Sequence, residues 1–115
     1  MLDGATLVGS FTRDGRQGTS EDKYTLGRVT KVKDDLWRIE ARMQYGGREA
    51  TFPFNIPVKW AGDDTPVMTV TDYAIPGMGT YSARIVFYKN QYAGMWSSPK
   101  GGGMMFGRVV KEPKP

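Results

Sequence analysis

Cysteine and histidine are both absent from this chain of 115 residues. Without cysteine the protein has no disulfide framework and no thiol chemistry, although this absence does not fix its compartment. Without histidine it lacks the usual general base at neutral pH and the commonest metal ligand. We therefore expect neither a metal site nor a cofactor.

Long hydrophobic runs are also absent. No apolar stretch approaches the roughly 18 residues that a membrane-spanning helix requires, so no membrane span is expected. The chain as given has no signal peptide. Met1 fits a native start as well as a start that replaced a removed leader, so the sequence leaves the localisation unknown.

Charge of a single sign is not concentrated in long blocks. The 16 basic and 12 acidic residues give a net charge of +4 and are mixed along the chain. This mixture is typical of a solvated surface and favours an anionic partner only mildly. Aromatic residues among basic ones can stack nucleic-acid bases, but the single-strand-binding barrels have about five strands. The segments counted below are more numerous, so a nucleic-acid partner is not expected.

Glycine and proline, in contrast, are plentiful, with 15 and 7 residues. They help to form seven turn clusters that divide the chain into eight segments of roughly 8–14 residues. The clusters are Asp14-Gly15-Arg16-Gln17-Gly18, Lys33-Asp34-Asp35, Gly46-Gly47, Gly62-Asp63-Asp64, Pro76-Gly77, Lys89-Asn90 and Pro99 to Gly103. Most segments alternate between apolar and polar residues, which indicates strands.

Eight short strands joined in sequence by tight turns favour a closed sheet. Eight is the number at which a barrel is just wide enough for side chains or one small ligand, and closure removes the exposed edges of an open sheet. We therefore predict an all-β fold, a single antiparallel eight-stranded up-and-down β-barrel with little or no helix. Residues 1–115 form one domain, with frayed ends at 1–4 and 111–115.

The clearest strand covers residues 49–60, where apolar and polar residues alternate without a break. Pro53 and Pro57 both lie on its polar face, and each lacks a backbone N–H. Alternate backbone groups point toward the same neighbouring strand, so the two prolines weaken pairing on one side only. We expect one fully paired flank and one open flank, as at a gap in a barrel.

Residues 34–45 fit two structures. Asp34 as a cap, apolar residues at helical spacing and a glycine stop would suit a helix. Five consecutive alternations and the Gly46-Gly47 hairpin signal favour a strand, which is our prediction. The second segment, around Tyr24 to Val32, alternates poorly, and Gly27 within it indicates a bulge or a sharp bend.

Large aromatic side chains dominate the faces expected to point inward: Trp37, Tyr45, Phe52, Phe54, Trp60, Tyr81, Phe87, Tyr92, Trp96 and Phe106. The best-alternating strands carry the six that we predict to form a ligand-binding face: Trp37, Phe52, Phe54, Tyr81, Tyr92 and Trp96. Tyrosine and tryptophan offer a broad apolar surface with one polar tip. Met104 and Met105 are adjacent, so one of them faces outward and hints at a protein contact.

Three further residues carry a resemblance to a known family. A Gly-x-aromatic near the start of an eight-stranded meander and an arginine on its last strand resemble the calycins, the lipocalin and fatty-acid-binding-protein group. The matching positions are Gly9, Phe11 (where lipocalins have tryptophan) and Arg108. The resemblance implies that Phe11 and Arg108 lie together and close one end of the barrel, around a pocket for a small apolar molecule. The chain is shorter than a typical lipocalin and has no C-terminal helix.

These features favour a non-enzymatic barrel that binds a small hydrophobic or aromatic molecule. One alternative is a structural or protein-interaction module whose barrel is filled by its own side chains. Another is a barrel enzyme of the cyclase or isomerase type that uses Arg108, Tyr92 or Tyr45. An internal cavity above about 300 Å³ would favour ligand binding. The sequence leaves the ligand's identity and the formation of a homo-oligomer open.

Overall fold

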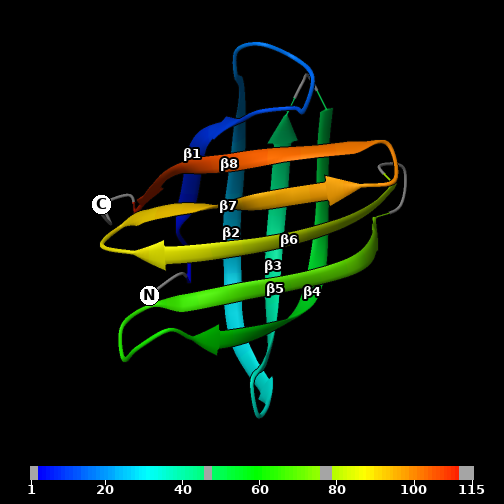
Figure 1. Ribbon diagram of the computed structural model, residues 1–115. Helices are drawn as coiled ribbons and strands as arrows, with labels where there is room; N and C mark the ends of the chain where they lie inside the picture. The colour runs from blue at the N-terminus through cyan, green and yellow to red at the C-terminus, as the bar shows by residue number, and fades with distance from the viewer. Residues whose placement is uncertain (1–2, 46–47, 76–78, 112–115) are drawn as a thin grey trace.

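The structure is a computed structural model, and it describes residues 3–45, 48–75 and 79–111. This part of the chain contains no helix and eight strands: β1 (Thr6–Phe11), β2 (Ser20–Lys33), β3 (Leu36–Tyr45), β4 (Arg48–Trp60), β5 (Pro66–Ile75), β6 (Gly79–Tyr88), β7 (Gln91–Ser98) and β8 (Gly101–Val110). Each strand pairs antiparallel with the next, and β8 pairs with β1 to close the barrel (Figure 1). The predicted all-β, eight-stranded up-and-down barrel is confirmed, and so is the strand, β3, expected within residues 34–45.

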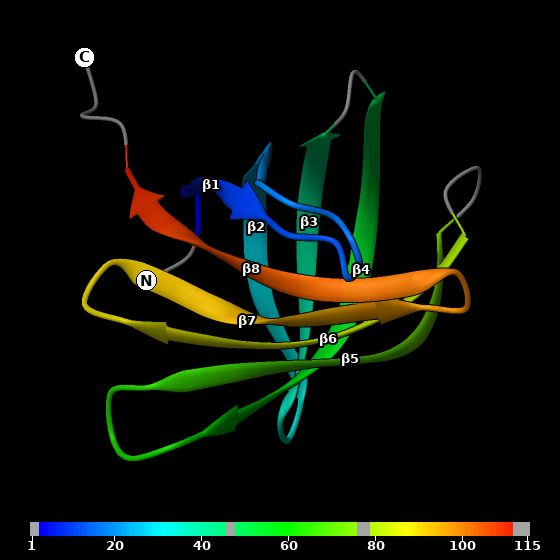
Figure 2. The same ribbon diagram turned by 45° about the horizontal axis from the view of Figure 1, so that its top comes forward.

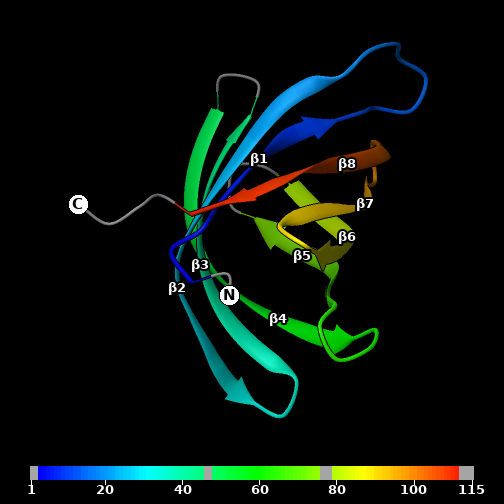
Figure 3. The same cartoon turned by 90° about the vertical axis from the view of Figure 1, so that its left-hand side faces the viewer.

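The barrel wall consists of two groups of strands that cross. In Figure 1, β2, β3 and β4 run upright, whereas β6, β7 and β8 run across them. Figure 2 gives the same arrangement after a tilt, and Figure 3 shows the two groups curving around opposite sides of the interior. Side chains alternate between the two faces of each strand, so both groups contribute to one core. Its largest fully buried side chains are Ile39 of β3 and Phe87 of β6.

Several of the predicted turns are present. Lys89 and Asn90 have φ angles of 49° and 62°, so both central residues of the β6–β7 turn are left-handed, as in a type I′ hairpin. The last turn is shorter than predicted, because β8 already begins at Gly101, within the glycine run. The turn signals Gly46-Gly47 and Pro76-Gly77 lie outside the described residues.

Strand β4 has one paired flank and one open flank, as predicted. It pairs with β3 from Arg48 to Pro57 but with β5 only from Val58 to Trp60. The amide of Val58 donates to the carbonyl oxygen of Asp35 at 2.8 Å, so the even-numbered amides face β3. The odd-numbered amides then face β5, and on that side Pro53 and Pro57 have no N–H to offer.

Strand β5 pairs with β4 only at Pro66 to Met68, and a bulge follows in β5 a few residues later. Its register against β6 shifts between Val70 and Tyr73, and Asp72 within the bulge has a φ of 48°. From β6, the Arg84 guanidinium donates to the carbonyl oxygen of Val70 at 2.8 Å and holds the bulge in place. Tyr73 spans the open side, where its hydroxyl accepts the backbone N–H of Asn55 at 3.3 Å.

Two aromatic residues expected inside the barrel face outward. Trp60, at the end of β4, is 52% exposed, and Phe106 of β8 is 46% exposed. The alternation along β8 is as predicted, but its inner face is the one that carries Met105, and Met104 lies outside with Phe106. Apolar residues occupy both faces of β8, so alternation alone does not identify the inner face.

The bulge predicted at Gly27 is present, because the register of β2 against β3 shifts between Leu26 and Val29. Asp3 and Gly4, expected to fray, are held against it. Asp3 Oδ1 accepts the N–H of Val29 at 2.7 Å, and the N–H of Gly4 donates to the carbonyl oxygen of Gly27 at 3.0 Å. Of the remaining end residues, 1–2 and 112–115 lie outside the described part of the chain.

Candidate functional site

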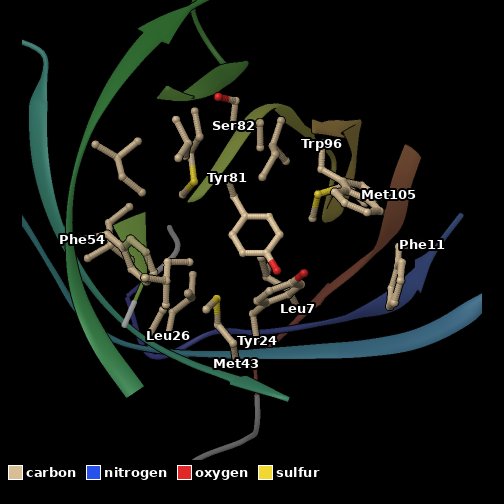
Figure 4. A pocket seen from close by; sticks show the side chains of 18 of the residues that line it. Leu7, Phe11, Tyr24, Leu26, Met43, Phe54, Tyr81, Ser82, Trp96 and Met105 are labelled. Carbon is tan, nitrogen blue, oxygen red and sulfur yellow. The ribbon is translucent and has the colours of Figure 1, made fainter. Parts of the chain in front are cut away.

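The barrel contains an internal cavity of about 190 Å³. Figure 4 shows side chains from several strands surrounding this space. Its aliphatic and methionine wall consists of Leu7, Leu26, Ile39, Ala41, Met43, Ile56, Met68, Val70, Ile75, Ala83, Ile85 and Met105. The aromatic members of the wall are Phe11, Tyr24, Phe54, Tyr81 and Trp96. A mainly apolar wall with a few polar groups is the usual composition of a small-molecule site.

The cavity opens at one end of the barrel. Its wall passes from buried residues to the half-buried Phe11 and Trp96 and then to the exposed Arg13. Trp96 is fixed there, since its Nε1 donates to the carbonyl oxygen of Thr12 at 3.1 Å and the ring of Phe11 packs edge-on at 6.1 Å. The guanidinium carbon of Arg13 lies 5.2 Å from the centre of the Trp96 ring. This stacked arginine is the one charged side chain in the described wall.

Two tyrosines bring hydroxyl groups into the cavity. Figure 4 shows Tyr24 and Tyr81 with their hydroxyl ends turned toward one another. The Tyr24 hydroxyl also donates to Oδ2 of Asp22 at 2.9 Å. Asp22 is only 4% exposed, and burial raises its pKa, while the hydrogen bond from Tyr24 opposes that rise. The apolar cavity therefore has one polar region, with a buried carboxyl group behind it.

A pair of glycines lets a third tyrosine lie across the barrel wall. In the register, Asp22 lies beside Gly9, Gly9 beside Gly107, and Gly107 beside Tyr92. A Cβ added to Gly9 or Gly107 would stand 2.5 or 2.8 Å from the Tyr92 hydroxyl, so the tyrosine occupies the space that both glycines leave open. The absence of both Cβ atoms is therefore what permits this packing.

The hydroxyl of Tyr92 and one carboxylate oxygen, Oδ1, of the neighbouring Asp22 are both buried without a hydrogen-bond partner among the described residues. Burial raises the pKa of Tyr92, and the nearby charge of Asp22 adds to this effect. A buried polar group without a partner costs about 1–3 kcal/mol, so this pair destabilises the fold that contains it.

Replacing Asp22 with asparagine is expected to stabilise the protein by about 1 kcal/mol at neutral pH. The amide oxygen still accepts from Tyr24, the amide nitrogen can donate to Tyr92, and no charge is buried. Because the folded-state pKa of Asp22 lies above its ordinary value of 3.8, the parent protein loses stability as the pH rises from that value through the raised pKa. The advantage of the variant should therefore grow over this window and vanish in acid. Denaturant unfolding at several pH values measures it.

Asp35→Asn is the matched control, because its expected effect on stability at neutral pH is opposite in sign to that of Asp22→Asn. A hydrogen bond from Lys59 lowers the pKa of Asp35, so this carboxylate stabilises the fold above its unfolded pKa and the contribution is lost as the pH falls. Removing the charge should cost stability at neutral pH and nothing in strong acid. A stability difference for Asp22→Asn that does not change with pH would contradict a buried, destabilising carboxylate.

Three of the six residues predicted to form the ligand-binding face line the cavity: Phe54, Tyr81 and Trp96. The other three pack into the core without reaching the described wall: Trp37, Phe52 and Tyr92. Phe52 supports the wall from behind, with its ring centre 6.2 Å from that of Phe54. Tyr81 and Trp96 lie together near the opening, with ring centres 6.4 Å apart. That these residues bind a ligand stays a prediction.

The structure does not bring Phe11 and Arg108 together. Phe11 lies on the inner face of β1, whereas Arg108 is exposed on the outer face of β8. The register places Met105 beside Phe11 and pairs Arg108 with Val8. A guanidinium on the outer face cannot stack on a ring inside the barrel. At the open end it is Arg13 that covers an aromatic ring, and this ring belongs to Trp96.

Two of the three residues considered for a barrel enzyme, Arg108 and Tyr92, are not part of the described cavity wall. Arg108 points outward, and the Tyr92 hydroxyl is enclosed against Gly9 and Gly107 rather than set in the cavity wall. The side chain of Tyr45 lies outside the described residues. Apart from Arg13 at the opening, the polar groups that the described wall offers are hydroxyls, which can orient a bound molecule.

Sequence reasoning missed most of the wall, including its aliphatic residues and Ser82. It also missed Tyr24 and Arg13 in the wall and Asp22 behind it. Before the bulge at Gly27, strand β2 alternates regularly and points Asp22, Tyr24 and Leu26 inward. Testing the alternation separately on each side of Gly27 would have found this face. Arg13 lies in the segment that follows β1. Its position over Trp96 is a contact between residues far apart in the sequence, and no pattern near Arg13 predicts it.

Metal chemistry has no evident site in residues 3–45, 48–75 and 79–111, where no three acidic, cysteine or histidine side chains gather to hold an ion. The same residues include no helix that is long and apolar enough to cross a membrane. Comparison with protein-family models, with curated proteins and with solved structures finds no match. The fold and the site define an eight-stranded antiparallel barrel with an apolar internal cavity, and a function has to be argued from that geometry.

Proposed function

We propose that this protein binds a small apolar or aromatic molecule inside its barrel and does not act as an enzyme. The observation that carries this proposal is the cavity, whose wall is almost entirely apolar and which opens beside Trp96 and Arg13. An apolar cavity of about 150 Å³ in another protein is large enough to take up benzene. The general shape of the barrel is consistent with a calycin-like fold, a group that holds its ligands in this position.

The cavity volume narrows the class of ligand. At about 190 Å³ it is smaller than the roughly 300 Å³ at which pockets for drug-sized molecules begin. A compact ligand of about one or two rings fits this space better than a long lipid chain. The hydroxyl groups of Tyr24 and Tyr81 lie where they can orient a single polar substituent. Because the cavity is smaller than the roughly 300 Å³ that would favour ligand binding, the alternative of an interaction module with a largely filled barrel stays open.

Toluene is expected to enter the cavity, and the methionines report where it binds. Met43, Met68 and Met105 line the wall, whereas Met95 and Met104 are 62% and 58% exposed on the outer surface. Aromatic ring currents act over short distances, so the methyl resonances of the first three should shift on titration and those of the last two should not. Methyl NMR spectra measure this difference within one sample.

Phe54→Leu tests the wall directly. The change keeps an apolar side chain but removes the ring, so toluene affinity is expected to fall about tenfold. Arg38→Ala is the control, because Arg38 forms an exposed ion pair with Glu40 and lies on the outside of β3. Equal shifts of all five methyl groups, or no shift of any, would count against binding in the cavity.

A further inference from the structure

Exposed apolar side chains gather on one outer face of the barrel. Nine large hydrophobic residues are exposed in the described chain, and seven of them lie on β1, β6, β7 and β8: Val8, Val86, Tyr88, Met95, Met104, Phe106 and Val110. We call these seven residues the apolar face. The four strands are neighbours in the barrel, and β6, β7 and β8 run side by side in Figure 1. Single exposed apolar residues are ordinary, but a contiguous patch marks an interaction surface.

The strand register joins Val86, Met95, Met104 and Phe106 into one part of the apolar face. Met95 of β7 pairs with Met104 of β8. One step along, Phe106 pairs with Ala93, and Ala93 pairs on its other side with Val86 of β6. Paired side chains on one face of a sheet lie about 5 Å apart, so these side chains form one surface rather than separate spots. In the neighbouring row, Arg108 and Gln91 lie between Val8 and Tyr88.

The charged side chains within β6, β7 and β8 and their turns are all basic, whereas acidic side chains such as Glu21, which pairs with Ser10 of β1, border the face from outside. Residues 79–111 include five basic side chains and no acidic one: Arg84, Lys89, Lys100, Arg108 and Lys111. Strand β1 has no charged residue. The three ion pairs among the described residues involve β3, β4 and the turn between β2 and β3: Arg38–Glu40, Arg42–Glu49 and Lys59–Asp35. Within residues 3–45, 48–75 and 79–111, none of these ion pairs involves a basic residue of β6, β7, β8 or their turns.

This charge pattern disfavours a second copy of the chain as the occupant. A two-fold contact would place the apolar face of one copy against that of the other and bring Arg84, Lys89 and Arg108 close to their own equivalents. A protein partner would need directional hydrogen bonds at its interface, and the outward polar side chains here are few, such as Ser10, Gln91 and Ser97. A lipid bilayer with anionic headgroups requires only apolar side chains that enter the headgroup region and basic side chains that contact phosphate.

We propose that the apolar face docks onto the surface of a membrane that contains anionic lipids. Met95, Met104 and Phe106 enter the headgroup region, and Arg108 and Lys89 contact the lipid phosphates. The exposure of these side chains and the excess of basic residues on β6, β7, β8 and their turns carry this inference, and neither depends on a ligand in the cavity. Binding should therefore be the same whether or not toluene is present.

Co-sedimentation with lipid vesicles tests the proposal. The protein is expected to bind vesicles of phosphatidylcholine mixed with phosphatidylglycerol, to dissociate as salt is added, and to bind phosphatidylcholine alone weakly. Arg108→Gln should lower the partition coefficient about fivefold. The pair Met95→Gln and Met104→Gln should lower it at least as much, because the inserted apolar area is lost. Circular dichroism checks that each variant is folded.

Matched substitutions on the other side of the barrel serve as controls. Val32→Gln removes an exposed apolar residue of β2, and Arg38→Gln removes a basic residue of β3, so neither should change vesicle binding. Four outcomes would overturn the proposal. They are no binding to mixed vesicles, equal binding to neutral vesicles, equal losses in the control variants, and a dimer in solution that the Met95 and Met104 substitutions disrupt. The last of these would assign the apolar face to a second copy of the chain.

Discussion

Gly9→Ala is expected to lower the stability of the barrel by about 3 kcal/mol, and the melting temperature by about 10 °C or more. The added Cβ would collide with the carbonyl oxygen of Phe106 and stand 2.8 Å from Cα of Gly107. It would also meet the hydroxyl of Tyr92 at 2.5 Å. A backbone atom cannot rotate aside as the end of a side chain can, so β1 and β8 would have to separate along the seam that closes the barrel.

Gly27→Ala is the matched control for this collision. Gly27 also lies in a strand, but the nearest atoms to its added Cβ belong to the side chain of Glu40, at 3.4 Å, and so its melting temperature should change little. Adding Tyr92→Phe removes the hydroxyl but leaves the backbone collision. The double variant should therefore be destabilised, relative to Tyr92→Phe alone, by about as much as Gly9→Ala is relative to the parent protein. A Gly9→Ala protein as stable as the Gly27→Ala protein would contradict the close approach of β1 and β8.

The number, order and direction of the strands could be predicted from the sequence because their signals are local. Alternation in residues 49–60 identifies β4, and the missing N–H groups of Pro53 and Pro57 identify its open flank without any knowledge of the neighbouring strand. The Gly27 bulge and the Lys89-Asn90 turn are similarly encoded within a few residues. Sequential turns leave few arrangements for eight such strands other than a meander.

The inner face of β8 could not be predicted in the same way, because both of its faces carry apolar residues. Met104 and Phe106 look as suitable for a core as Met105 does. What distinguishes the faces is that Gly107 lies on the side of Met105, beside Gly9, where Tyr92 needs room. This is a relation among three strands, and no pattern within one strand reports it. The expected contact between Phe11 and Arg108 is absent because Arg108 lies on the outer face of β8, which the sequence did not distinguish from the inner face.

The cavity wall could be predicted only in part, because a cavity lies where side chains fail to meet. The largest aromatic residues were expected to surround the ligand, but Trp37, Phe52 and Tyr92 fill the core elsewhere. Medium-sized aliphatic side chains surround most of the space that remains. Their individual burial follows from alternation, whereas the unfilled volume between them depends on the packing of all the strands together.

Ala41→Leu is expected to abolish ligand binding by filling the cavity from within. Ala41 is 7% exposed and belongs to the cavity wall on β3. Leucine adds three carbon atoms to a space of about 190 Å³, which removes much of the room for a compact aromatic molecule. Toluene affinity should fall about a hundredfold. The methyl resonances of the wall methionines, measured during a titration, determine the affinity.

The melting temperature of Ala41→Leu shows whether a loss of toluene affinity comes from a filled cavity or from an unfolded protein. Burying three more carbon atoms stabilises by about 2 kcal/mol, and strain in a packed interior costs about 1–3 kcal/mol, so the melting temperature should change little. Ala93→Leu is the control, since it makes the same change on the outer face of β7 and should leave toluene binding intact. Unchanged affinity in Ala41→Leu would place the ligand outside the cavity. Lost affinity in Ala93→Leu would place it on the apolar face, because that substitution alters no part of the cavity wall.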